Sequence, residues 1–131
     1  MKNSAFNEVK KLKTIYRIQD KDGRGPWRPG FSFKWIEVRY DHKKLIPYFF
    51  EFRGTDFSLE AKESVMATGC RTIAQLQRWF TSNEYATLLK YGYAAVKLKA
   101  DRIIAESDIQ CVFAQNEPLR KNVTKFALYS E

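Results

Sequence analysis

The hydrophobic pattern of the chain changes its period at Gly92, and this change restricts the fold more than any other feature. Before it, residues 72–75 and 81–84 follow the Thr-x-x-Gln/Glu pattern of a capping box, in which two side chains satisfy free backbone amides at the start of a helix. Gly92 itself is typical of the residue that ends such a helix. After it, residues 94–99 alternate in polarity, as a half-buried strand does. Two short helices followed by strands indicate an α+β fold.

Strands are predicted on both sides of the two helices. Residues 12–19 alternate in polarity, residues 31–40 begin with a ring at every second position, and residues 109–114 are apolar on both faces, as in a central strand. The other expected segments are a strand or packed loop at 46–52, a helical turn at 58–63, a connection at 66–69, and strands at 102–105 and 124–129. The expected fold is therefore a single compact α+β domain, with a mixed or antiparallel sheet and two short central helices.

The length of 131 residues fits one domain, 1–131, and leaves no room for a second of ordinary size. Residues 1–11 are polar and basic, and they form either a loose basic arm or a short helix. Hydrophobic residues make up 44% of the chain and charged residues 29%, a balance that argues against disorder. No apolar run approaches the roughly 20 residues of a membrane span, and no signal-peptide stretch follows the N-terminus. A cytoplasmic protein is expected.

Histidine and cysteine are scarce, which disfavours several kinds of site. The chain has two cysteines, Cys70 and Cys111, and one histidine, His42. Two cysteines do not make a disulfide framework, and this set lacks the ligand spacing of familiar zinc sites. A Ser-His-Asp hydrolase is disfavoured as well. We expect no metal, free thiols in a reducing compartment, and a buried, unreactive Cys111 in the middle of its strand.

An excess of basic residues gives the chain a formal charge of +8, from 23 Lys and Arg against 15 Asp and Glu. This charge favours an acidic or polyanionic partner, such as a nucleic acid or an acidic protein surface. The basic residues recur along the whole chain and accompany no recognisable nucleic-acid-binding module. A merely solvated surface therefore stays open as the alternative.

The loop GRGPWRPG, residues 23–30, is the first candidate binding element. Its glycines let backbone amides approach a phosphate, and Arg24, Trp27 and Arg28 can pair with or stack on a ligand. It is neither a Walker motif nor a dinucleotide fingerprint. The alternative is a tight connection with Trp27 packed on the sheet, since glycine and proline mark turns in general.

Two further places combine polar and apolar residues as a cleft does. Arg17 lies in the middle of the first strand, where it either points into a cleft or pairs with a carboxylate at a sheet edge. Glu106, Asp108 and Gln110 collect where a buried strand begins, and they are either catalytic groups or the polar residues of a turn.

Five short motifs carry a resemblance to a known family. They are Tyr16-Arg17, Gly23-Arg24-Gly25-Pro26, Gln75-Leu76-Gln77-Arg78-Trp79-Phe80, Gly92-Tyr93 and Gln110-x-Val112-Phe113. Over roughly residues 15–120 the chain resembles a family of small proteins encoded by phages and prophages. That family pattern is in turn distantly similar to mono-ADP-ribosyltransferases, so the resemblance implies a fold of that type and NAD as a cofactor.

The likeness to the transferases implies a set of NAD-binding residues. Arg17 matches a first-strand arginine that holds NAD, and Thr72 weakly matches a serine- or threonine-bearing segment. Tyr16 or Trp27 would stack on a ring of NAD, and Arg24 would pair with it.

The same likeness implies a catalytic carboxylate close to Gln110. Gln110 stands where the transferases carry a glutamate, and an amide cannot stabilise an oxocarbenium-like centre as a carboxylate does. Either Glu106 or Asp108 takes that role, or the site is degenerate.

The function implied by the resemblance is that of a phage accessory protein in the cytoplasm of the bacterial host. It would act on a host protein, by mono-ADP-ribosyl transfer from NAD. One alternative is a non-catalytic inhibitor that binds a host nucleic-acid-handling defence complex, as anti-CRISPR proteins do. The other is a direct nucleic-acid binder, and the substitution of Gln110 for a glutamate favours binding over catalysis.

Overall fold

The structure is a computed structural model, and it describes residues 11–27, 30–37 and 45–130. Most of the arm predicted at 1–11, the last residues of the strand predicted at 31–40, Arg28 and His42 lie outside the described residues.

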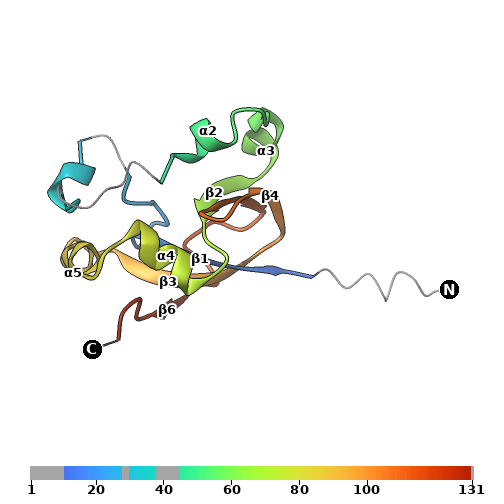
Figure 1. Ribbon diagram of the computed structural model, residues 1–131. Coiled ribbons are helices and arrows are strands. Elements are labelled where there is room, and N and C mark those ends of the chain that lie inside the picture. The colour runs from blue at the N-terminus through green and yellow to red at the C-terminus, as the bar shows by residue number, and fades with distance from the viewer. Residues whose placement is uncertain (1–10, 28–29, 38–44, 131) are drawn as a thin grey trace.

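Six strands of the described part of the chain form two antiparallel three-stranded sheets (Figure 1). The first sheet has the order β1-β3-β6, with β1 at Lys13–Gln19, β3 at Ala94–Ala100 and β6 at Thr124–Phe126. The second has the order β2-β5-β4, with β2 at Val65–Gly69, β5 at Cys111–Gln115 and β4 at Arg102–Glu106. An isolated bridge between Tyr16 and Cys70 joins the two sheets. The predicted α+β class is confirmed, and all the strand pairing is antiparallel.

The two central helices begin where the capping boxes place them. Helix α4 spans Ile73–Trp79 and helix α5 spans Ser82–Lys90. The Thr72 and Thr81 hydroxyls accept hydrogen bonds from the backbone amides three residues later, at 3.0 and 3.1 Å. Gly92 follows α5 with a φ of +86°, a left-handed conformation that glycine adopts without strain. Two shorter helices, α2 at Tyr48–Glu51 and α3 at Ser58–Glu63, lie at the top of Figure 1, and α3 confirms the helical turn predicted at 58–63.

Glu84 extends the second capping box into a tertiary contact. The side chain is fully buried, and its Oε1 accepts from Thr81 N at 2.9 Å while its Oε2 accepts from Glu37 N at 2.8 Å. One carboxylate therefore joins the start of α5 to the segment that follows the loop at residues 20–30.

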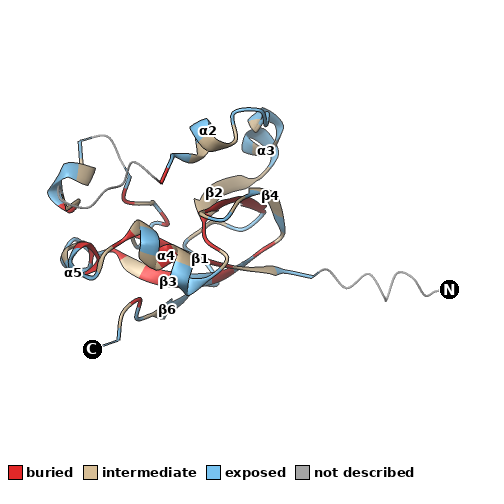
Figure 2. Ribbon diagram, viewed as in Figure 1, coloured by how far each residue is buried: buried red, intermediate tan, exposed pale blue. Residues whose placement is uncertain are grey.

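The core has two parts, which appear as buried ribbon in Figure 2. One lies between the sheets and contains Ile15, Leu98 and Phe113, and the other packs α4 and α5 against the first sheet. Every residue of β5 is buried, which confirms the predicted central strand. Gly69 sits where the two sheets pack closely, because a Cβ there would lie only 2.4 Å from Ile15 Cγ2.

The strand predicted at 31–40 is wrong for the residues that the structure describes. Ser32–Lys34 form a short 3-10 helix, η1, in which Lys34 N donates to Phe31 O and Trp35 N donates to Ser32 O. The rings do not share one face: Trp35 is buried, whereas Phe33 is 71% exposed. A ring at every second position is typical of a strand. Here Trp35 packs against the rings of Trp27 and Phe80, and this contact, which the local spacing does not show, determines the backbone.

Two further segments differ from the prediction for the same kind of reason. Within 46–52 the structure has helix α2 and no strand, and Pro47 O accepts from the amides of Phe50 and Glu51 at its start. The segment predicted as a connection, 66–69, belongs to β2, which pairs with β5 over its whole length. This pairing partner lies more than 40 residues away, so local pattern could not reveal it.

Candidate functional site

A cavity of about 890 Å³ lies between the sheets and the loops that cover one side of them. Its walls come from β1, β2, α4, the start of β5 and the segments 23–27 and 45–49. Most of its lining side chains are apolar, and several are rings: Trp27, Tyr48, Phe49, Trp79 and Phe80. A cavity of this size, with apolar walls and a few polar groups, is the usual form of a small-molecule site.

Arg17 is the charged group of this cavity that is most buried, with 6% of its surface exposed. Its Nη1 donates to Thr68 O at 2.9 Å and its Nη2 to Gly23 O at 3.2 Å, while its Nε is enclosed without a partner. No carboxylate among the described residues lies within ion-pair distance of it. Of the two positions that the sequence left open for Arg17, the structure shows the cleft.

Burial lowers the pKa of Arg17 to about 10, and the nearby charge of Asp20 offsets only part of this effect. The guanidinium therefore still carries its charge at neutral pH. A buried cation without a directly bonded carboxylate is costly, and a bound anion would offset that cost.

The loop that ends at Trp27 folds over Arg17. Its Gly25 lies so close that a Cβ there would be 3.4 Å from Arg17 Nη2. Trp27 is 45% exposed and also packs edge-on against Trp35, with ring centroids 4.7 Å apart. The sequence allowed an exposed recognition residue or a packed one, and the structure combines the two at the rim of the cavity.

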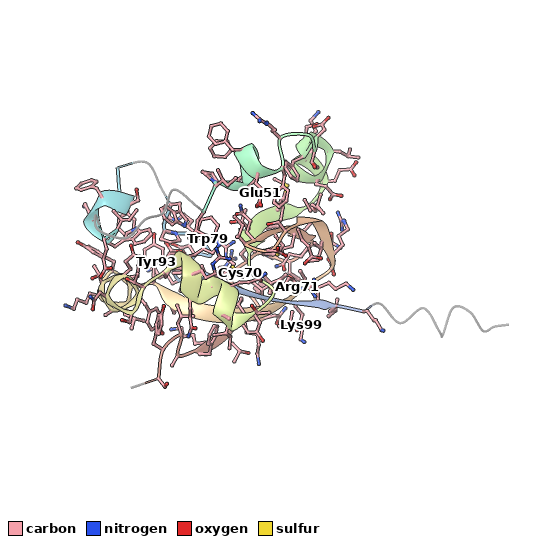
Figure 3. The ribbon with its side chains drawn as sticks, in the orientation of Figure 1. Glu51, Cys70, Arg71, Trp79, Tyr93 and Lys99 are labelled. Carbon is pink, nitrogen blue, oxygen red and sulfur yellow. The ribbon has the colours of Figure 1, made fainter. Side chains whose placement is uncertain are left out.

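Gln110 lines the cavity from the residue before β5, and it is 5% exposed. Its amide nitrogen donates to Ile46 O at 2.7 Å and to Glu51 Oε1 at 2.9 Å. These bonds tie the wall formed by residues 45–49 and α2 to the body of the molecule. Figure 3 shows Glu51 extending from α2 toward the side on which Cys70 and Trp79 lie.

The remaining residues of the predicted NAD site lie elsewhere. Glu106 is on the surface, where its Oε2 is 3.3 Å from Arg71 Nη1, and the exposed Asp108 accepts a bond from Gln75 through its backbone oxygen. Thr72 caps α4, and Tyr16 packs edge-on against Phe126. The structure therefore brings Arg17, Arg24, Trp27 and Gln110 to one cavity, and it places Glu106, Asp108, Thr72 and Tyr16 outside the lining.

One family model, described as Bacteriophage T4 Y00F protein, matches residues 1–127 of the chain. The chain belongs to this family. The match confirms the resemblance to small phage proteins, and it lends no support to the remoter likeness to ADP-ribosyltransferases. No curated protein and no solved structure matches the chain.

The two thiols of this Y00F family member are buried and free. Burial raises the pKa of Cys70 and of Cys111 to about 12, so both stay protonated at neutral pH. Cys111 is the buried core residue that the sequence predicted. Cys70 lines the cavity, but a protonated, buried thiol is a poor nucleophile.

Sequence reasoning missed the ring-bearing wall of the cavity at 45–49 and the contribution of α4. The sequence predicts a helix for Trp79, but the spacing of its rings does not show that Trp79 lines the same cavity as Arg17. The Trp79 indole Nε1 donates to Ile109 O at 2.7 Å, which holds the ring beside Gln110. That contact connects residues 30 positions apart and has no local signature.

Some of the exposed basic residues pair with an acid and others do not. Arg24, Arg71 and Arg102 each pair with a carboxylate. Lys97 and Lys125 of the first sheet are exposed with no carboxylate of the described residues in ion-pair range, and Lys99 donates to the Thr14 hydroxyl at 2.6 Å. Lys97 and Lys99 alternate on β3 and therefore share one face.

Residues 11–27, 30–37 and 45–130 lack two further kinds of feature. No helix there is long and apolar enough to cross a membrane. No group of three or more His, Cys, Asp or Glu side chains there could hold a metal ion.

Proposed function

We propose that this phage protein binds a small anionic ligand that carries an aromatic ring, of the nucleotide class, in the cavity that contains Arg17. The observation that carries the proposal is a buried guanidinium that lines a ring-lined cavity of about 890 Å³ and has no carboxylate of the described residues in ion-pair range. Arginine binds phosphate through parallel N–H bonds, and the rings offer faces for a base. NAD, the cofactor implied by the resemblance, belongs to this class.

The arrangement favours binding over ADP-ribosyl transfer. The transfer reaction needs a carboxylate beside the ribosyl centre. Gln110 lines the cavity, whereas the carboxylates of Glu106 and Asp108 do not. We therefore propose a ligand-binding protein in which Arg17 contacts the anion and Trp27 and Trp79 flank the ring.

A thermal-shift titration tests the binding. NAD and AMP at millimolar concentration should raise the unfolding temperature, since a ligand at 100 times its dissociation constant stabilises a protein by about 2.7 kcal/mol. Arg17→Met should abolish the shift, because it removes the charge and keeps an unbranched apolar stem. Arg53→Met is the matched control, since it removes the same charge from an exposed residue outside the cavity lining.

Transfer itself has a separate test. Incubation with radiolabelled NAD and bacterial lysate should leave all proteins unlabelled. Label on a protein in the presence of the wild type, and its absence with Arg17→Met, would restore the transferase hypothesis. No thermal shift with any nucleotide would refute the binding proposal.

The lysine face of β3, made of Lys97 and Lys99, supports a second candidate function. Neither lysine has a carboxylate of the described residues in ion-pair range, so both carry charge that is available to a polyanion. Such a face could bind a nucleic acid or an acidic surface of a host defence complex. Affinity for single- and double-stranded probes should then fall steeply between about 50 and 200 mM salt, and a double variant Lys97→Met, Lys99→Met should flatten that dependence.

A further inference from the structure

Gln110 presents a hydrogen-bond acceptor to the cavity, and its neighbours fix which end of its amide does so. Its nitrogen faces Ile46 O and the Glu51 carboxylate, and both of these groups only accept hydrogen bonds. The opposite orientation would place three oxygens together without a proton. The amide oxygen must therefore point away from α2.

That oxygen is the free end of the side chain. Gln110 Oε1 receives no hydrogen bond from the described residues. It also differs from Gln19 Oε1 and Gln115 Oε1, which are enclosed without a partner. Since Gln110 lines the cavity, its oxygen is the acceptor that a ligand there would meet.

Two polar groups of opposite character thus face one ring-lined space. Arg17 of β1 offers N–H donors and a positive charge, and Gln110 before β5 offers a carbonyl oxygen. A ligand that satisfies both has an anionic group and a ring that carries an N–H donor. A ring with a carbonyl oxygen at the same position would instead leave two acceptors facing each other.

We infer that the cavity selects nucleotides whose base carries an exocyclic amino group, and that Gln110 is the residue that reads it. This inference rests on the proposed function, because it assumes that the ring of the ligand lies in this cavity. It also gives the glutamine a chemical reason: a glutamate at 110 would face Glu51 at hydrogen-bond distance, and Ile46 O and Glu51 Oε1 would both lose their Gln110 donor.

Matched nucleotide pairs test the inference by calorimetry. AMP and IMP share their phosphate and ribose. They differ at C6, an amino group against a carbonyl, and at N1, an acceptor in AMP and an N–H donor in IMP; CMP and UMP differ in the same way at C4 and N3. The amino member should bind about 10–100-fold more tightly in each pair, as expected when a buried acceptor is left unpaired.

Gln110→Lys is the matched variant, because lysine keeps donors for Ile46 O and Glu51 and offers no acceptor. It should bind both members of a pair with similar affinity. The readout is the ratio of the two affinities, so a general gain from the added charge cancels. The wild-type ratio alone remains decisive if this variant does not fold.

Equal affinity of the wild type for AMP and IMP would overturn the inference and leave the proposed function standing. Absence of binding by every nucleotide, including NAD, would refute the proposed function and the inference with it. A preference for AMP that persists in a folded Gln110→Lys variant would show that another group reads the base, and it would remove Gln110 from this role.

Discussion

Replacement of Trp27 by alanine removes a ring that packs against neighbours and also lines the cavity. The side chain is 45% exposed, and its ring centroid lies 4.7 Å from that of Trp35 and 6.0 Å from that of Phe80. An aromatic ring buries up to about 250 Å² when it is fully covered, so this one buries about 130 Å². At about 25 cal/mol per Å² the loss is about 3 kcal/mol, and residual burial in the unfolded chain lowers it toward about 2 kcal/mol.

Urea denaturation measures this loss. With a slope of about 2 kcal/mol/M, a loss of about 2–3 kcal/mol lowers the unfolding midpoint by about 1–1.5 M. Trp27→Phe should lose less, because phenylalanine keeps a ring against Trp35. Phe33→Ala is the matched surface control, since Phe33 is 71% exposed, and its midpoint should stay close to that of the wild type.

An unchanged midpoint for Trp27→Ala would refute the packing argument and leave Trp27 as a recognition residue alone. A loss above about 4 kcal/mol, typical of fully buried rings, would show that the loop covers the ring more completely than the structure does. In both cases the titrations with NAD and AMP should be repeated on the variant, because a ring that flanks the ligand should weaken its binding.

Three further predictions concern packing, buried hydrogen bonds and pH. Gly69→Ala places a Cβ 2.4 Å from a side chain of β1 and should lower stability by about 1–3 kcal/mol in denaturant, whereas Gly54→Ala meets no atom within 4 Å and should be neutral. Glu84→Gln turns one of two accepting oxygens into a donor that faces an N–H group, and it should cost about 1–3 kcal/mol in the same assay. Burial raises the pKa of Cys70 and of Cys111 to about 12, so as pH rises above about 9 the unfolded chain releases these protons first and stability falls between about pH 9 and 12. A variant with alanine at both cysteines should lose stability less steeply over that range.

Each of these predictions has an outcome that contradicts it. Equal stabilities for the two glycine variants would mean that the sheets do not meet closely at Gly69. A neutral Glu84→Gln variant would remove the carboxylate as the link between α5 and the preceding segment. Parallel curves of stability against pH for the wild type and the double cysteine variant would show that the thiols are not buried.

Local interactions explain why the sequence predicts some parts of this fold well. The capping boxes at Thr72 and Thr81 involve residues only three positions apart. Gly92 is required by the left-handed conformation of a single residue. Both features can therefore be recognised within a short segment of the sequence. The alternation at 12–19 and 94–99 and the apolar run at 109–114 likewise reflect which faces are buried. The α+β class and the burial of Cys111 follow from these patterns.

The predictions of secondary structure are wrong where a residue far away in the sequence determines the backbone conformation. Residues 66–69 form a strand because β5 lies beside them, and Trp35 turns inward because the rings of Trp27 and Phe80 cover it. Helix α2 is held by Gln110, which lies 59 residues from Glu51. The hydrophobic pattern of a short segment does not reveal contacts with distant residues. The same short sequence is compatible with more than one local structure, and the distant contact selects one of them.

The candidate site divides in the same way. The sequence by itself determined that Arg17 lies in mid-strand, that a glycine-rich loop with a tryptophan follows it, and that Gln110 precedes a buried strand. Only the tertiary structure decided that these three reach one cavity while Glu106 and Asp108 stay outside it. The physical reason is that a cavity forms where elements distant in the chain fail to fill the space between them, and that depends on how the two sheets and the loops pack together.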